Sequence, residues 1–262
     1  MGVRFLVRGR VPVLTLGLLA VLITPASAQP ADFLFRKPTV TVGIRGGWAV
    51  ARAQSEIFDF TSEQLIHPVR DPQDPPKAIE PGDFASPVVQ FEVAVATALR
   101  FDVMVGVGVS ESSIDSESRG FVGTDDLPIG QTTRFLRVPV TAGVKVYLKN
   151  RGRAVSRLAW VPYSCSPWLG AGAGGMYSRF EQSGEFVDFE TLEIFRKDFR
   201  SVGSSPTAHL SGGMDVSLGA HFLATGEARY VWGKADMSKD FVGFDRIDLS
   251  GFQITAGISA RF

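Results

Sequence analysis

Three features that define other classes of protein are scarce in this sequence. Cys165 is the only cysteine in 262 residues, which excludes an intramolecular disulfide framework and a zinc cluster of cysteines. After residue 28, no apolar run reaches the roughly 18 residues that indicate a membrane-spanning helix. Basic and acidic residues number 27 each, so the excess of positive charge typical of nucleic-acid binding is missing and no nucleic-acid partner is expected.

The first 28 residues have the pattern of an export signal. Three arginines precede an apolar run over 11–23, and Ala26-Ser27-Ala28 supplies the small residues of a cleavage site. The apolar run is shorter than the ~20 residues of a retained membrane helix. We therefore predict a cleaved signal peptide over 1–28. Since it removes three arginines and no acids, the mature chain 29–262 holds 24 basic and 27 acidic residues.

The end of the chain alternates between apolar and polar side chains. Every second residue is apolar: Phe252, Ile254, Ala256, Ile258, Ala260 and Phe262. Successive side chains of a strand point to opposite faces, so 251–262 is predicted to be a strand with one apolar and one polar face. Its length suits a tilted crossing of a hydrocarbon layer. An amphipathic strand of a soluble sandwich has the same alternation, so the rest of the chain must discriminate between them.

The same two-residue period recurs along the mature chain. It predicts eight strands, over about 37–51, 88–98, 101–109, 134–148, 159–177, 208–218, 221–235 and 251–262. Long polar connections, over about 52–86, 111–131, 178–205 and 236–249, alternate with short turns. A soluble sandwich has no reason to keep this order, whereas an outer-membrane barrel joins an even number of strands by short periplasmic turns and longer extracellular loops. The predicted fold is all-β: an eight-stranded, antiparallel, up-and-down transmembrane β-barrel.

Three segments carry a resemblance to known proteins: RFLRVPVTAGVKVYL at 134–148, PWLGAGAGGMY at 167–177 and GFQITAGISARF at 251–262. On these segments the mature chain resembles the small eight-stranded outer-membrane barrel families, a group that includes OmpA-, OmpX- and OmpW-type and opacity-protein porin-like domains. The resemblance implies residence in the cell outer membrane, contact with its lipid and lipopolysaccharide, and insertion by the barrel-assembly machinery. It also places Gly257 and Phe262 in the assembly signal. Such families include anchors, adhesins, small-solute channels and lipid-modifying enzymes, so the resemblance implies architecture rather than activity.

Charged side chains recur on the polar parity of the predicted strands. Nine are expected to face inward: Arg45, Glu92, Asp102, Arg137, Lys145, Asp215, Glu227, Arg229 and Arg261. An eight-stranded barrel is just wide enough for side chains to fill, and buried charges are costly unless they are paired. We therefore predict a mutually neutralising polar core in a protein with a structural or surface-interaction role. The alternative is a narrow porin-like channel for small solutes, because inward glycines leave unfilled volume in the lumen.

A histidine and a serine two positions apart raise a second alternative. His209 and Ser211 share one face of a predicted strand, and Glu227 on the next strand could orient the histidine. Barrel lipases that deacylate lipopolysaccharide have a similar arrangement, so a lipid A-modifying hydrolase is conceivable. The parity points both side chains into the lumen, away from acyl chains. We therefore predict no catalytic residue and no enzymatic activity, and expect neither metal nor cofactor.

Aromatic residues occur in two settings. Tryptophans and tyrosines near predicted strand ends, Trp160 and Trp168 among them, are expected at the membrane interfaces. The four predicted loops are rich in phenylalanine, which fully solvated loops rarely contain. We expect these loops to extend the barrel above the membrane, to pack on one another, or to bind an extracellular ligand or lipid.

Overall fold

The computed structural model describes residues 33–69, 71, 75–123, 127–188 and 190–262. The predicted signal peptide and cleavage site lie outside these residues. Most of the described chain is β-strand. No helix in the described ranges is both long and apolar enough to cross a membrane.

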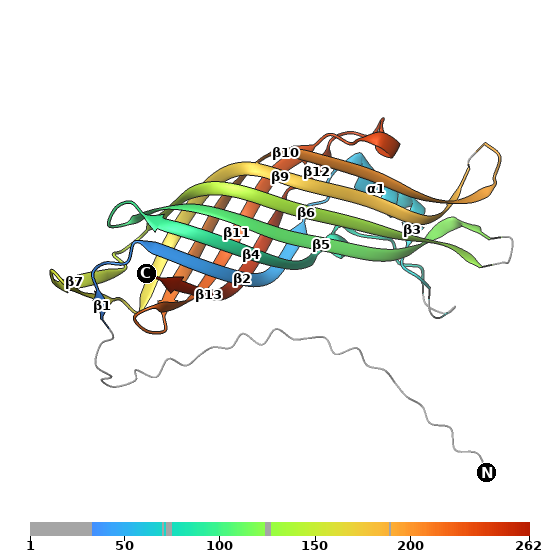
Figure 1. The fold of residues 1–262 in the computed structure, drawn as a ribbon. Helices are drawn as coiled ribbons and strands as arrows, with labels where there is room; N and C mark the ends of the chain where they lie inside the picture. The colour runs from blue at the N-terminus through green and yellow to red at the C-terminus, as the bar shows by residue number, and fades with distance from the viewer. Residues whose placement is uncertain (1–32, 70, 72–74, 124–126, 189) are drawn as a thin grey trace, which may run out of the picture. The chain divides into compact units, whose positions relative to one another are not determined.

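Eight long strands make up the wall of the described part (Figure 1). They are β2 (Val40–Ala51), β4 (Ser86–Ala96), β5 (Phe101–Val122), β6 (Pro128–Tyr147), β9 (Cys165–Val187), β10 (Ile194–Ser217), β11 (Phe222–Ala235) and β13 (Gly251–Arg261). Each pairs antiparallel with the next, and β13 pairs with β2. The ring of pairings is uneven, because β5, β6, β9 and β10 have 20–24 residues whereas β2, β4 and β13 have 11 or 12.

The two ends of the wall differ, and each is named here by its residues. The loop end comprises the described residues of 52–85, 110–135, 178–205 and 234–250, where the β5–β6 and β9–β10 hairpins project. The turn end comprises 33–39, 97–100, 148–164 and 218–221, and the last residue of the chain lies beside it (Figure 1).

The predicted loops at 111–131 and 178–205 are largely strand, which corrects the sequence-based bounds of the third, fourth, fifth and sixth strands. Their outward side chains are polar here, as Glu111, Ser113 and Asp115 show, while Ser112 and Ile114 between them are buried. A strand that is exposed to water on its outer face needs no apolar parity there. Its composition therefore resembles that of a loop, and the two-residue pattern loses its contrast.

The predicted fifth strand, 159–177, is divided in two. Residues Ala159–Pro162 form β8, which pairs with β7 (Gly152–Ser156) and β1 (Leu34–Phe35) in a separate three-stranded sheet at the turn end. The wall strand β9 begins only at Cys165, whose thiol is free and half-buried. Pro162 has no N–H to donate to a ladder, so the strand ends there. The expected short basic turn is thus part of a hairpin.

The described residues of the first predicted loop, 52–86, include helices that pack in an apolar core. The loop contains α1 (Glu56–Gln64), the short strand β3 (Leu65–Ile66), which pairs with β5, and the 3-10 helix η1 (Pro81–Phe84). Phe58 of α1 contacts Phe84, Phe135 and Phe180, with ring centroids 4.8, 5.4 and 5.9 Å away. These edge-to-face contacts extend to the fourth predicted loop, which contains η2 (Lys239–Phe241) and β12 (Ile247–Asp248).

A polar contact joins His67, which follows β3, to Asp83 of η1. The Nε2 atom of His67 and the backbone N–H of Glu80 both lie 2.8 Å from Oδ2 of Asp83. Burial acts to raise the pKa of Asp83, but the hydrogen bonds from Glu80 and His67 outweigh it, so the pKa lies below its usual value.

Candidate functional site

The outward face of the wall carries a continuous belt without a single charged side chain. The belt consists of every second residue of 40–50, 87–95, 101–109, 136–148, 169–177, 206–218, 222–232 and 252–262. Its members are apolar, glycine, tyrosine or tryptophan, and many are widely exposed: Ile44 and Ile254 expose 59% and Val105 exposes 55% of their surface. An uncovered apolar area of this extent marks a surface that meets something other than water.

Charged residues occupy the outward parity again where the belt meets the loop end. Five strands each place a charged residue two positions beyond their last belt residue: Arg52, Glu111, Arg134, Arg179 and Lys234. Arg179 lies 3.1 Å from Glu111. The belt therefore has a defined upper border, set by the sequence of each strand separately.

Five of the nine inward charges meet at the centre of the lumen and are called here the lumen network: Arg45, Glu92, Lys145, Glu227 and Arg229. Arg45 Nη2 lies 2.8 Å from Glu92 Oε2 and 3.2 Å from Glu227 Oε2. Lys145 Nζ donates to Glu92 Oε1, and Arg229 Nε donates to Glu227 Oε1 at 2.6 Å. All five side chains are buried. Two carboxylates thus hold three cations, and the charges are paired as low-dielectric burial requires.

The other four predicted charges face inward but lie outside the lumen network. Asp102 pairs with Arg151 at 2.8 Å. Asp215 accepts hydrogen bonds from Tyr147 Oη at 2.9 Å and from Trp168 Nε1 at 3.3 Å. Arg261 donates to the carbonyls of Gly219 and Ala220. Arg137 lies 5.2 Å from the centroid of the Phe135 ring and forms no ion pair with any described residue.

Three partners of these charges escaped the reasoning from sequence. Arg151 belongs to the segment predicted as a turn, and Tyr147 and Trp168 are aromatic residues at strand ends. Tyr147 and Trp168 are partners across the β6–β9 ladder, and both are buried on the inward parity. The expectation that Trp160 and Trp168 lie at a membrane interface is therefore wrong, because both are buried and Trp168 points into the lumen. The signal was present in the parity of Trp168, which matches that of Gly170 and Gly172.

The inward glycines of β9 do not leave open volume. A methyl group at Gly172 would collide with the His209 ring and with the carbonyl of Ala142. A methyl group at Gly170 would meet Ser211 Oγ. Side chains from β10 therefore occupy the space that these glycines provide, and the wall at this side of the lumen is packed.

His209 and Ser211 are not arranged as a catalytic pair. Both are buried in the lumen, and neither the ring nitrogens of His209 nor the hydroxyl of Ser211 has a hydrogen-bond partner among the described residues. Glu227, the third member considered, is held by Arg45 and Arg229. A serine nucleophile needs a base within hydrogen-bond reach and an acid that orients the base. In the described part of the chain, no group of three or more His, Cys, Asp or Glu side chains could hold a metal ion.

Apolar side chains are buried at both ends of the wall. At the loop end, the phenylalanine core around Phe58 packs against inward residues of the wall such as Met176 and Val231. At the turn end, Trp160 of β8 is buried, and the Arg261 guanidinium lies 5.3 Å from its ring centroid. Charge pairs therefore occupy the middle of the lumen, and buried apolar side chains lie near each of its ends.

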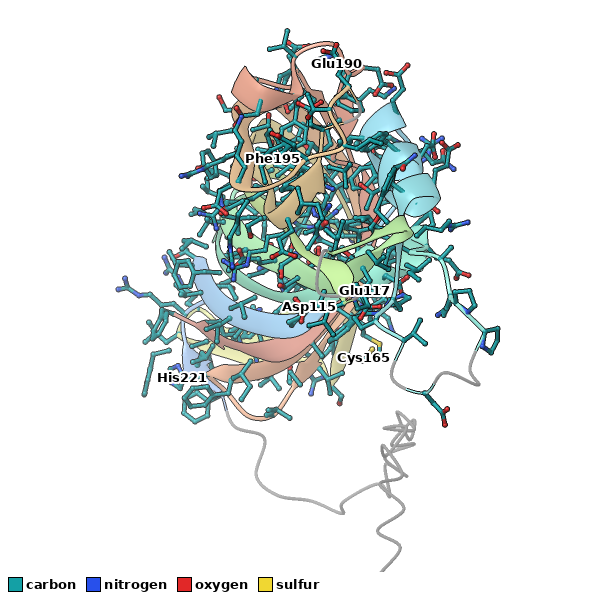
Figure 2. The ribbon with its side chains drawn as sticks, turned by 90° about the vertical axis from the view of Figure 1, so that its right-hand side faces the viewer. Asp115, Glu117, Cys165, Glu190, Phe195 and His221 are labelled. Atoms are coloured by element: carbon teal, nitrogen blue, oxygen red, sulfur yellow. The ribbon has the colours of Figure 1, made fainter. Side chains whose placement is uncertain are left out.

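The loop end also has an open aromatic groove. A cavity of about 210 Å³ is lined chiefly by Phe60, Phe186, Phe195, Phe199 and Phe244. Figure 2 views the protein from this end and shows Phe195 on the β9–β10 hairpin, apart from the acidic residues Asp115 and Glu117 on β5. Phe60 and Phe195 are partly exposed at this groove.

No family model matches the chain, and no curated protein matches its sequence. Among solved structures, it is similar to the attachment invasion locus protein Ail of Yersinia pestis, at 13% identity and a TM-score of 0.42, over 86% of this chain and 100% of that one. It is also similar to Neisserial surface protein A, at 10% identity and a TM-score of 0.43, over 85% of this chain and 96% of that one. It is similar as well to the N-terminal β-barrel domain of Pseudomonas aeruginosa OprF, at 8% identity and a TM-score of 0.30, over 86% of this chain and 100% of that one. Likenesses of this size assign the chain neither a family nor a function.

Proposed function

We propose that the mature chain is a closed eight-stranded β-barrel that spans the outer membrane and has a structural or surface-interaction role. The uncharged outward belt carries this proposal. An arginine or lysine facing lipid at the bilayer midplane costs about 2–4 kcal/mol, so a transmembrane barrel must keep its outer face free of charge. A soluble barrel has no such constraint.

The pattern of strand pairing supports the same proposal. The membrane interior offers no water to backbone N–H and C=O groups, so a spanning sheet must close on itself. Here each long strand has two neighbours, because β13 pairs with β2 from Gly251↔Ala51 to Arg261↔Thr41. With short turns on the periplasmic side, the loop end projects from the cell and the turn end faces the periplasm.

The filled lumen favours a plug over a conducting channel. The lumen network neutralises itself except for one positive charge, since three cations face two carboxylates. The phenylalanine core covers its outer mouth. We therefore assign the surface-interaction role to the aromatic groove, where Phe60 and Phe195 are exposed.

One observation favours a narrow channel as the second candidate. His209, Ser211 and Thr255 have buried polar atoms without hydrogen-bond partners among the described residues. Buried polar groups of this kind usually bind ordered water. A file of such waters along β10 and β13 would give a path for small solutes if the covers at the two ends opened.

Planar-bilayer recording of the refolded mature chain tests the proposal. Insertion without steady conductance supports the plug, and large, steady conductance supports the channel instead. Failure to insert into bilayers, or recovery of the native protein as a soluble periplasmic species, would contradict the barrel itself. His209→Ala/Ser211→Ala, assayed for lipid A deacylation against the unchanged chain, tests the absence of hydrolase activity.

A further inference from the structure

The turn end carries positive charge and no negative charge. Seven basic residues lie in its four segments: Arg36, Lys37, Arg100, Lys149, Arg151, Arg153 and Arg157. The same segments, all of which the structure describes, contain no aspartate or glutamate. At the loop end, by contrast, β5, β9 and β10 each carry both basic and acidic residues. Since the chain as a whole is neutral, this is a local accumulation of charge.

Most of these cations have no anionic partner. Arg36, Lys149, Arg153 and Arg157 are exposed, and none forms an ion pair with a described residue. Arg151 pairs through Nη1 with Asp102, while its Nη2 atom is buried without a hydrogen-bond partner in the described chain. Arg151 is therefore the only one of the seven cations that forms an ion pair with a described carboxylate. Such a surface attracts anions.

Part of this charge surrounds a cavity. A volume of about 320 Å³ is lined by Lys37, Arg151 and Arg153 together with Asn150, Leu99, Trp160 and Tyr163. Residues of β7 and β8 form part of its lining, and Trp160 of β8 packs on Gly152 of β7. A side chain at Gly152 would collide with the Trp160 ring, so a glycine is needed for the hairpin to close.

Apolar side chains connect the cavity to the belt. Leu99 lines the cavity and exposes 68% of its surface. Of the belt residues, Phe101 follows Leu99 by two positions, and Leu148 comes directly after the neighbouring strand β6. On the hairpin itself, Val155 and Leu158 alternate with basic residues and expose about as much. A ligand here would meet cations at one end and a lipid-facing surface at the other.

We infer that the turn end binds anionic phospholipids of the adjoining leaflet. The phosphate occupies the cavity beside Lys37, Arg151 and Arg153, and the acyl chains lie on Leu99 and the belt. Guanidinium groups suit phosphate because they offer several N–H donors in one plane. A soluble polyanion would need the cations but not the apolar border. This inference rests on the proposed membrane insertion.

The test uses the refolded mature chain in phosphatidylcholine vesicles, with and without phosphatidylglycerol. Lipids that remain bound after gentle extraction are counted by native mass spectrometry. The unchanged chain should retain phosphatidylglycerol in preference to phosphatidylcholine, and added salt should weaken this preference. Lys37→Gln/Arg153→Gln should reduce the preference by about 10–30-fold, since each cation contributes separately near an anionic surface.

Two controls separate the cavity from charge in general. Arg196→Gln/Lys234→Gln removes one lysine and one arginine at the loop end and should change the preference less than about twofold. Lys37→Arg/Arg153→Lys keeps the charge and should retain most of the preference. Equal losses in both glutamine variants, or no preference in the unchanged chain, would overturn the inference.

The source of the phosphate is tested by competition. Inorganic phosphate should not displace phosphatidylglycerol at equal concentration, because it lacks the acyl chains that lie on Leu99. Displacement would overturn the lipid assignment in favour of a free phosphate site. An unchanged chain that inserts but shows no lipid preference refutes only this inference, whereas a chain that does not insert refutes the proposed function.

Discussion

Glu92→Gln removes the carboxylate on which the lumen network depends most. Glu92 lies 2.8 Å from Arg45, contacts Lys145, and lies 3.8 Å from Arg229. With Glu227 as the only remaining anion, the network changes from three cations and two anions to three cations and one. Its excess charge rises from +1 to +2, and Lys145 loses its carboxylate partner.

The expected cost is large because the site is buried. Breaking a buried ion pair by removing one partner costs about 3–5 kcal/mol, since the other charge stays uncompensated. Urea unfolding of the refolded protein in lipid vesicles measures it, with Glu111→Gln as the matched control. Glu111 pairs with Arg179 at the wet border of the belt, where an ion pair contributes only about 0–1 kcal/mol.

A double variant checks the cause. Glu92→Gln/Lys145→Met leaves Arg45 and Arg229 with Glu227, which restores the excess charge to +1 and should recover much of the lost free energy of unfolding. The single variant should also raise bilayer conductance, because an unpaired lumen charge recruits water. A cost of less than about 1 kcal/mol for Glu92→Gln, equal to that of Glu111→Gln, would refute a lumen held by mutual neutralisation.

Four further outcomes are expected. Ala256→Arg should lower the free energy of unfolding in vesicles by about 2–4 kcal/mol, whereas the cost of Thr255→Arg depends on room in the lumen. A cysteine scan of 252–261 in a Cys165→Ser background should give lipid-probe labelling at even positions only. Labelling without this two-residue period contradicts the register. The pKa of Asp83 is lowered in the folded state, so its stabilisation is present above the ordinary aspartate pKa of about 3.9 and is lost as the pH falls below it. Asp83→Asn should therefore be less stable than the unchanged chain at about pH 7, and the difference should be smaller at about pH 3, as urea midpoints would show; an equal difference at both pH values speaks against the assignment. N-terminal sequencing of the protein from the outer-membrane fraction should give Gln29 as the first residue, and an intact Met1 contradicts the predicted cleavage.

The sequence by itself determined which side chains face outward and which face inward. In 251–262 the even positions are on the outer face and Gln253, Thr255 and Ser259 are buried, as the two-residue period predicts. All nine predicted inward charges are buried in the structure. Parity is a local property, because successive side chains of any strand point to opposite faces wherever the strand lies. It can therefore be worked out from one segment at a time.

Only the tertiary structure decided which of these side chains meet. Glu92, which lies opposite Gly43 on β2 and Gly106 on β5, meets Arg45, Lys145 and Arg229 from three other strands. Register between strands far apart in sequence is set by the packing of the whole wall, and a single strand carries no record of it.

The same reason explains the two ends. Strands β5, β6, β9 and β10 continue past the belt because their inner faces pack on α1 and the phenylalanine core. The hairpin at 152–162 forms because Trp160 packs on Gly152 and pairs with Leu34. Polar sequence in these segments resembles a loop until a partner covers one face. Whether such a segment becomes a strand depends on burial against residues far along the chain, and burial exists only in the folded protein.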